Sequence, residues 1–176
     1  MFTSAEPSAI HARDLVVHLC SVQIARQLIR AWHSRLPHTQ ASPWQYAFAA
    51  SYDGVVYAVA LWHNPSARTL PSHWLELRRM ACAPDAPKNT ASRFLALMVD
   101  WFRHNAPTRE RCISYQDESV HRGTIYKAAG WTVGARQVAR KRDRSKPRRG
   151  TDRPYRTSAN GSAVDCAAKT RWEKSL

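Results

Sequence analysis

Three polar residues in the C-terminal half of the chain are spaced so that they could transfer protons. Ser114 and Asp117 lie at the end of a short apolar run, and Tyr126 follows in a segment of helical character. Side chains at the carboxyl end of a strand occupy the place where α/β domains bind ligands. A tyrosine there could act as a general acid and an aspartate as a general base. Alternatively, Asp117 caps a helix and Tyr126 packs with its hydroxyl at the surface.

A second set of residues could bind an anion. The sequence DAPKN at 85–89 joins a predicted strand to a helix that starts near residue 90. The first turn of a helix presents unpaired backbone N–H groups and the positive end of the helix dipole, which together can hold a pyrophosphate. An ordinary helix cap is the alternative, because the loop is not rich in glycine. The candidate residues are Lys88, Asn89, Thr90, Ala91 and Ser92.

Charged residues on the strand before this loop could pair with one another or contact a ligand. Strict alternation would put Glu76 and Arg78 on one face of the strand and Arg79 on the other. They could form a cross-strand ion pair, or an arginine could clamp an anionic substrate. The histidines and cysteines match no common metal-ligand spacing and include no Cys-x-x-Cys pair, so we expect no metal site.

A sheet flanked by helices must position these residues. The chain alternates helical and strand-like segments, which indicates an α/β or α+β domain. An Asp-Gly pair between two β-rich runs predicts a hairpin, and Gly130 is expected just past a helix end. The predicted elements are a strand over Leu15–Leu19, a helix that reaches Trp32, a hairpin over Trp44–Trp62, a strand over His73–Ala83, a helix over Thr90–Asn105, a strand over Arg111–Tyr115, a helix over Ser119–Ala129 and a strand over Trp131–Val138.

Positive charge is concentrated near the end of the chain. The 176 residues carry a formal net charge of +14, and Arg136–Arg156 holds ten Lys and Arg against two Asp. Polyanions bind such a segment by counterion release, which makes double-stranded DNA the first partner to consider; a solubilising tail is the alternative. We expect a catalytic domain over residues 1–138 and a basic arm and tail over 139–176. The residues expected to contact DNA are Arg140, Lys141, Arg142, Arg144, Lys146, Arg148 and Arg149.

The sequence gives no sign of export or membrane insertion. The first residues include the acidic Glu6 and no apolar stretch of signal-peptide length, and no later run approaches the roughly 20 apolar residues of a membrane helix. The four cysteines are widely separated, as is typical of reduced thiols. We therefore expect a cytoplasmic protein without a membrane partner.

Four short motifs carry a resemblance to a known family. They are ELRRM at 76–80, PKNTAS at 87–92, SYQD at 114–117 and GTIYKAAG at 123–130, of which the last is the most specific. Through them the region Leu75–Trp131 resembles the central block of the phage Mom-type DNA-modification proteins, which belong to the GCN5-related acyltransferase (GNAT) superfamily.

The resemblance implies a GNAT-like, mostly antiparallel mixed sheet that is splayed in the middle. Acetyl-CoA or a related acyl donor would lie in the splay, contacting Met80 and Cys82, with its pyrophosphate on the anion site described above. Tyr126 would protonate the leaving thiolate or stabilise the reacting end, and Ser114 and Asp117 would belong to the reaction centre. Mom-type proteins convert adenine in DNA to a carbamoylmethyl form that blocks restriction enzymes, which implies an anti-restriction role for this chain.

One departure from the superfamily leaves other functions open. The pyrophosphate loop of ordinary acetyltransferases is rich in glycine, whereas residues 86–91 read APKNTA. The chain could instead be an acyl-CoA-dependent N-acetyltransferase for a small amine or a protein, or a non-catalytic DNA-binding protein on a GNAT fold. A DNA-modifying enzyme must also flip its target base, and Trp32, Trp44 or Trp62 could stack on that base, although large aromatic residues are more often in the core.

Overall fold

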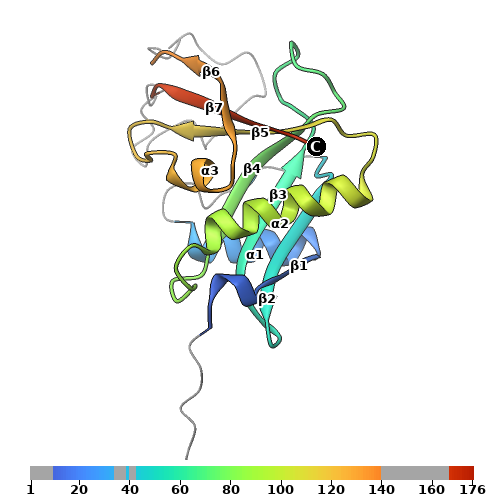
Figure 1. Ribbon diagram of the computed structural model, residues 1–176, viewed down its shortest axis with the longest axis vertical. Coiled ribbons are helices and arrows are strands. Elements are labelled where there is room, and N and C mark those ends of the chain that lie inside the picture. Colours follow the sequence, from blue (N-terminus) through green and yellow to red (C-terminus); the bar gives the residue numbers. More distant parts are fainter. Residues whose placement is uncertain (1–9, 34–38, 40–42, 140–166) are drawn as a thin grey trace, which may run out of the picture.

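The computed structural model describes residues 10–33, 39, 43–139 and 167–176 (Figure 1). Within these residues the chain forms one seven-stranded sheet in the order β1-β2-β3-β4-β5-β7-β6. Only β4 and β5 are parallel, so the sheet is mixed and mostly antiparallel, as the sequence predicts. The elements are a 3-10 helix at Ala12–Asp14, β1 Val16–Leu19, α1 Val22–Trp32, β2 Tyr46–Tyr52, β3 Val55–His63, β4 Leu75–Cys82, α2 Thr90–Asn105, β5 Arg111–Asp117, α3 Thr124–Ala128, β6 Thr132–Gln137 and β7 Lys169–Ser175.

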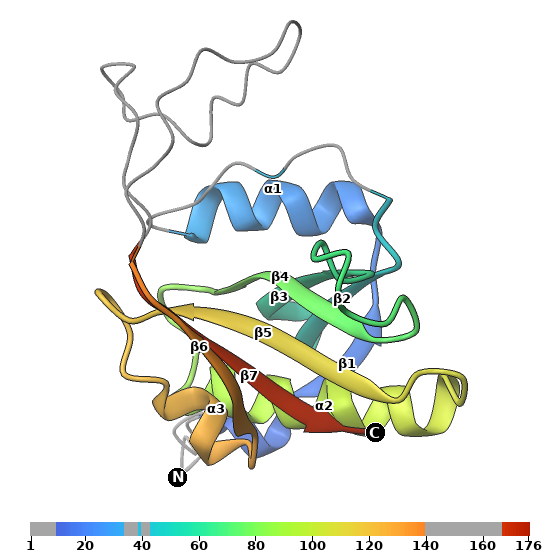
Figure 2. The same cartoon turned by 90° about the horizontal axis from the view of Figure 1, so that it is seen from above.

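Helices cover both faces of the sheet (Figure 2). One face packs against α1 through a small core that includes Ile29 and Leu61, and the other packs against α2 and α3 through a larger core that includes Phe102. Trp62 is fully buried in the larger core and donates its indole N–H to the sulfur of Met98, so it belongs to the core rather than to a base-stacking surface. No helix in the described part of the chain has both the length and the apolar character to cross a membrane.

Residues with positive φ explain two local features of the fold. Asp53 and Gly54 both have positive φ, at 46° and 77°, which confirms the predicted hairpin between β2 and β3. The helix predicted over Ser119–Ala129 is shorter than expected, because α3 begins only after Gly123 at φ 71°. A Cβ atom at Gly123 would lie 2.5 Å from the ring of Trp172, so only glycine fits this close approach.

The sheet divides at the junction of its two parallel strands. β4 and β5 pair over three residues only, Leu75–Leu77 with Cys112–Ser114. Beyond Leu77 and Ser114, β4 continues alongside β3 while β5 continues alongside β7. The two halves of the sheet therefore separate and leave a fork that opens toward the carboxyl ends of β4 and β5.

A bulge in β4 corrects the predicted arrangement of its charged residues. Leu61 pairs with Arg79 and Trp62 pairs with Leu77, so Arg78 is an extra residue without its own partner on β3. Because the bulge interrupts strict alternation, Arg79 lies on the same face as Glu76 and not on the opposite one. Arg78 still reaches Glu76, with its Nη1 donating to Oε1 at 3.0 Å.

The C-terminal strand belongs to the sheet. β7 lies between β5 and β6 and pairs with both along its length, so the folded domain does not end at residue 138 as the sequence suggests. Its Trp172 is 4% exposed and packs in the larger core. Residues 169–175 are therefore an integral strand, because without them β5 and β6 have no partner on this side.

We predict that a chain ending at Val138 will not fold cooperatively. Loss of a buried tryptophan alone costs about 3–5 kcal/mol, a large part of the roughly 5–15 kcal/mol that stabilises a domain, and the truncation also removes the strand between β5 and β6. Thermal melting followed by circular dichroism tests this. The matched control is the full chain with Arg140, Lys141 and Arg142 changed to Gln. A truncated chain that melts as sharply and at the same temperature as this control would contradict the placement of β7.

Candidate active site

A buried pair of hydroxyl groups lies at the apex of the fork. Ser114 is the last residue of β5 that pairs with β4, opposite Leu77, and is 3% exposed. Tyr126 projects from α3, is 8% exposed, and its hydroxyl lies 2.8 Å from the Ser114 Oγ. The structure thus brings together two of the three residues that the sequence marks for proton transfer, at the point where the strands separate.

Tyr126 is held in place by two tryptophans. Its ring stacks on Trp172 with 5.4 Å between centroids and an angle of 10°, and contacts the edge of Trp131 at 5.7 Å. Trp172 is itself fixed, because its indole N–H donates to Gln116 Oε1 at 2.7 Å. The sequence did not place Gln116 and Trp172 at the site, because Trp172 lies in the predicted tail and suggested only that the tail packs back on the body. Charged residues at the alternate positions 169, 171 and 173 around it were the available signal of a strand.

The surroundings of Tyr126 keep its phenol protonated. Burial raises the pKa of Tyr126 above its ordinary value, and the hydrogen bond with Ser114 opposes this only in part. At neutral pH the side chain is therefore a neutral hydroxyl that can donate a proton, and Ser114 fixes the direction in which it points.

Asp117 is not part of this pair. Ser114 and Gln116 face α3, so alternation along β5 directs Asp117 to the opposite face of the sheet. Its Oδ1 accepts a hydrogen bond from the backbone N–H of Ser119 at 3.0 Å and a second from the Ser119 hydroxyl. The carboxylate therefore holds the turn after β5, a local capping contact that corrects the expectation of a shared site.

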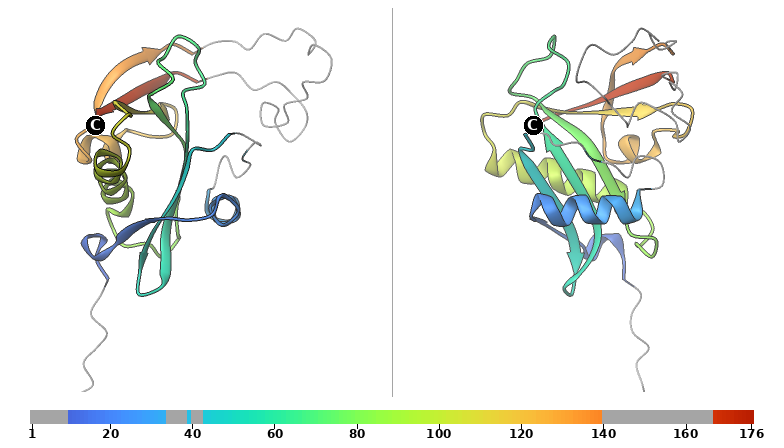
Figure 3. Two further views of the ribbon diagram at one scale, coloured as in Figure 1. Left: turned by 90° about the vertical axis from the view of Figure 1, so that its right-hand side faces the viewer. Right: turned by 180° about the vertical axis from the view of Figure 1, so that it is seen from behind.

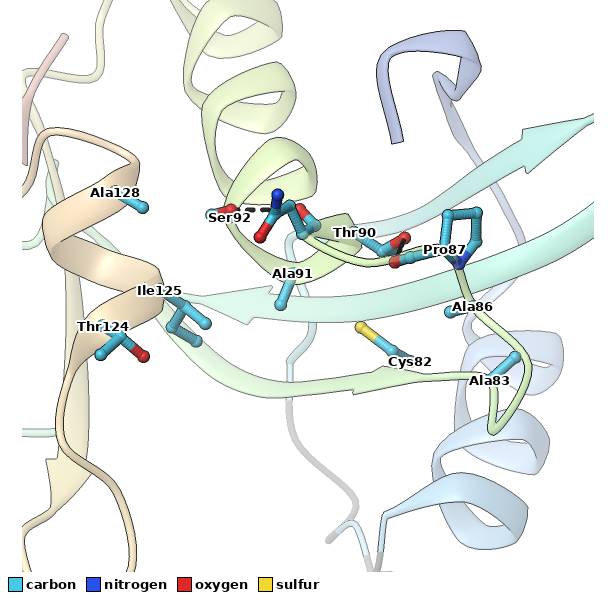
Figure 4. Close-up of a pocket in the computed structure, with 11 residues that line it drawn as sticks. Cys82, Ala83, Ala86, Pro87, Thr90, Ala91, Ser92, Thr124, Ile125 and Ala128 are labelled. Carbon is cyan, nitrogen blue, oxygen red and sulfur yellow. Dashed lines mark hydrogen bonds between the residues drawn. The ribbon is translucent and has the colours of Figure 1, made fainter. Parts of the chain in front are cut away.

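A pocket lies between the start of α2 and the side of α3, with a volume of about 350 Å³ (Figure 4). Four of the predicted first-turn residues line it, together with Cys82 from the end of β4. Two other predicted residues do not line it: Lys88 is exposed and Met80 packs against the core. The opposite wall comes from α3, which the sequence did not mark. The lining residues are Cys82, Ala83, Ala86, Pro87, Asn89, Thr90, Ala91, Ser92, Thr124, Ile125 and Ala128.

The start of α2 is built to leave backbone N–H groups available. Asn89 precedes the helix in the left-handed conformation, at φ 70°, and makes no side-chain cap. The hydroxyls of Thr90 and Ser92 donate to carbonyl oxygens, at 2.7 and 3.1 Å, and so do not cap N–H groups either. The first bond from one turn to the next is donated by Arg93. The backbone N–H of Thr90 donates to the carbonyl of Pro87 at 3.1 Å, so the N–H groups of Ala91 and Ser92 are the ones that remain for an anion.

Asn89 also explains why the loop lacks glycine. Asparagine is one of the few residues that adopt positive φ at modest cost, so it supplies the backbone conformation that glycine provides elsewhere.

The thiol of Cys82 is not a nucleophile in this pocket, because burial raises its pKa to about 11 and keeps it protonated.

The predicted DNA-contacting residues 140–149 lie outside the described residues. The strands that flank them are described. Gln137 at the end of β6 pairs with Lys169 at the start of β7, and Lys169 pairs with Asp117 at the end of β5. The chain thus leaves and re-enters the described structure at the open end of the fork.

Comparison with known proteins identifies the family. The sequence pattern of the Mom protein family matches residues 14–165, which include the fork, the pocket and the Ser114–Tyr126 pair. The chain belongs to the Mom protein family. This confirms the resemblance carried by the four motifs. β7, which completes the site of this Mom chain, lies beyond the matched residues. None of the curated proteins matches the sequence.

Solved structures confirm the GNAT fold of this Mom chain. A Bacillus subtilis acetyltransferase in complex with CoA aligns at a TM-score of 0.59 and 12% identity, over 92% of this chain and 99% of that one. An acetyltransferase of the GNAT family from Streptococcus pneumoniae aligns at 0.58 and 11%, over 92% and 99%. A spermidine/spermine N-acetyltransferase from Vibrio cholerae aligns at 0.59 and 7%, over 93% and 94%. The splayed sheet implied by the resemblance is therefore present.

The buried phenol predicts a specific loss of stability at alkaline pH. Because the pKa of Tyr126 is raised in the folded state, its contribution to stability is complete below the ordinary tyrosine pKa of about 10 and is lost as pH rises toward the folded value. Wild type should therefore lose stability relative to Tyr126→Phe above pH 10. Urea unfolding of both proteins at pH 8 and above pH 10 measures this, with Tyr52→Phe, at an exposed position, as the control. A wild-type-to-variant difference that does not vary with pH would refute the assignment.

Proposed function

We propose that this protein is a DNA-modifying transferase that uses acyl-CoA or a related donor to modify adenine. The observation that carries the proposal is the Ser114–Tyr126 pair at the apex of the fork, 2.8 Å apart, buried, and on the same side of the sheet as the pocket at the start of α2. A proton donor on the same side of the sheet as a candidate phosphate site suits transfer from a thioester, because the departing thiolate can be protonated there.

The pocket fits a donor of the CoA type. The N–H groups at the start of α2 suit the pyrophosphate, and the apolar Ile125 and Ala128 on the opposite wall suit an extended, uncharged arm. The B. subtilis protein of the same fold binds CoA, which supports this assignment. When bound, such a donor supplies an activated group on a sulfur that leaves as a thiolate.

The residues of the chain then have separate tasks. The first turn of α2 fixes the donor through its phosphates. Ser114 holds the Tyr126 hydroxyl toward the fork, and the two tryptophans prevent the ring from turning away. As the adenine amino nitrogen bonds to the transferred group, the bond from that group to sulfur would break. The proton carried by the Tyr126 Oη would pass to the departing sulfur, and the proton that the nitrogen loses would restore the phenol. Asp117 has no direct part in this step, because it lies on the other face and holds Ser119.

DNA as the acceptor is supported by charge. The formal net charge of +14 attracts polyanions, and the described strands that flank the most basic residues, β6 and β7, meet at the open end of the fork. The second candidate is acetylation of a small amine, supported by the fold shared with the V. cholerae spermidine/spermine enzyme. A polyamine is a cation, however, and a surface of this charge would repel it. A protein that only binds DNA does not require the buried hydroxyl pair of Ser114 and Tyr126.

The direct test is mass spectrometry of nucleosides from plasmid DNA of cells that express the protein. We expect a heavier deoxyadenosine whose added mass identifies the transferred group. Tyr126→Phe should lower its yield by roughly 10²- to 10⁴-fold, the usual contribution of one acid–base group, while Tyr52→Phe should match wild type. Unmodified DNA from cells that contain the folded protein would overturn the proposal in favour of amine acetylation or DNA binding alone.

The donor site predicts opposite effects of one substitution on stability and on binding. Ser92→Asp places a carboxylate in the first turn of α2, where it should stabilise the helix by about 0.3–1 kcal/mol through the helix dipole. The same charge should repel the pyrophosphate and weaken CoA binding about fivefold or more, since like charges at close range cost on the order of 1 kcal/mol or more. Calorimetric titration with CoA and thermal melting test both effects, with Ser92→Asn as the uncharged control. Unchanged affinity in Ser92→Asp would place the phosphates elsewhere.

A further inference from the structure

The face of the sheet opposite the donor pocket carries two glutamates in one row of paired residues. The strand registers align His63, Glu76, Ile113 and Glu173 side by side across β3, β4, β5 and β7. Directly paired residues point to the same face, so both glutamates lie on the face that α1 covers. Both are buried, at 1% and 7% exposure.

α1 covers only part of this face. It packs against β2, β3 and β4, so the side of the sheet formed by β5, β7 and β6 lies beyond the helix (Figure 3, right). The boundary of the covered part falls at the fork. In the described part of the chain, this side of the fork lies across the sheet from the donor pocket, which opens beside α2 and α3.

Each of the two glutamates already has an arginine as its hydrogen-bond partner. Glu76 accepts hydrogen bonds from Arg78 at 3.0 Å and from the backbone of Ser66 at 2.9 Å. Glu173 accepts from Arg171, at 2.9 Å, and from Arg111. Each carboxylate thus has its own charged partners, and the set as a whole is positive.

Arg79, in contrast, pairs with neither glutamate. It shares a face with Glu76 but forms no ion pair among the described residues; its Nη1 donates only to the carbonyl of Arg78 at 2.8 Å. Its Nε is buried and has no hydrogen-bond partner. Burial first, and the charge of Arg78 second, lower the pKa of Arg79 to about 10, so the guanidinium stays charged at neutral pH. A buried, charged donor without an acceptor is costly unless a ligand supplies one.

Arg79 lies beside the point where the two strands of the fork separate. It lies on β4 just past the last pair with β5, and Tyr115 is the first residue of β5 past the same point. Arg171 pairs with Tyr115 from β7. Alternation directs Tyr115 away from Ser114 and toward the face of Arg79. Two arginines and a phenol thus border the fork on the face opposite the donor.

We propose that Arg79, Tyr115 and Arg171 form a subsite for a phosphodiester of the nucleic-acid acceptor, at the rim of the fork on the α1 face. The inference rests on the proposed function, because it assigns the place where the acceptor is held. Guanidinium groups bind phosphate oxygens in two-point contacts, and a phenol adds a further donor. The donor's own phosphates do not compete, since their site lies across the sheet. A phosphate held here directs the attached nucleoside toward the opening above Ser114 and Tyr126.

The test compares two variants that each remove one positive charge from the full chain. Arg79→Gln removes the proposed contact, whereas Arg13→Gln changes an exposed arginine, 79% accessible, that precedes β1. Binding of a fluorescent double-stranded oligonucleotide is measured over a series of NaCl concentrations, and the circular dichroism spectrum and melting temperature of the same samples show whether each variant is folded. We expect Arg79→Gln to weaken DNA binding about tenfold and to reduce the slope of log affinity against log salt by about one unit. Tyr115→Phe should weaken binding by a few fold.

The outcomes separate this subsite from the proposed reaction. A folded Arg79→Gln protein that keeps the wild-type affinity and salt slope overturns the subsite, even if adenine is modified. Equal losses in Arg79→Gln and Arg13→Gln overturn it as well, because they indicate a general effect of charge. A loss confined to Arg79→Gln supports the subsite even if no modified nucleoside is found, in which case only the proposed reaction fails. A wild-type protein that does not bind the oligonucleotide overturns the subsite for nucleic acid.

Discussion

The parallel pairing of β4 with β5 over only three residues is the constraint on which the rest of the structure depends. Longer pairing would close the sheet and leave no opening at its centre. No pairing at all would let the two halves separate and disperse the residues around the fork. Three residues are enough to fix Ser114 beside Leu77, and the divergence beyond them creates one opening that both faces share. In the proposed reaction, donor and acceptor would meet at this opening, each bound on its own side of the sheet.

Aromatic packing keeps this opening rigid where chemistry needs it. Tyr126 comes from a helix of only five residues, which could not fix a side chain by itself. Its orientation comes instead from Trp131 and Trp172, and Gln116 holds Trp172 in turn. Gly123 permits α3 to approach Trp172 closely enough for this contact. The two tryptophans, and not the short helix itself, therefore fix the position of Tyr126.

The sequence alone predicts those parts of the molecule that obey local rules. The hairpin at Asp53–Gly54, the amphipathic α2 and the family motifs all follow from short segments, and they locate the donor pocket and Tyr126. The bulge at Arg78 could not be predicted, because it exists only in the pairing of β4 with β3. Asp117 was misplaced since β5 continues past Tyr115, so that alternation turns its carboxylate away. β7 was missed because a long basic stretch separates its residues from the strands they join.

The interior position of β7 also governs when the site can form. The pairs between β5 and β7 join residues 52 or more positions apart, so closing them is slow compared with the formation of the β2–β3 hairpin or of α2. β6 has no neighbour in the sheet until β7 arrives. During synthesis, β1 to β5 and the helices can assemble first, whereas Tyr126 lacks its supporting tryptophan until residues 169–175 have been added. Catalytic competence is therefore a late event in folding, reached only after the basic segment that precedes β7 has been made.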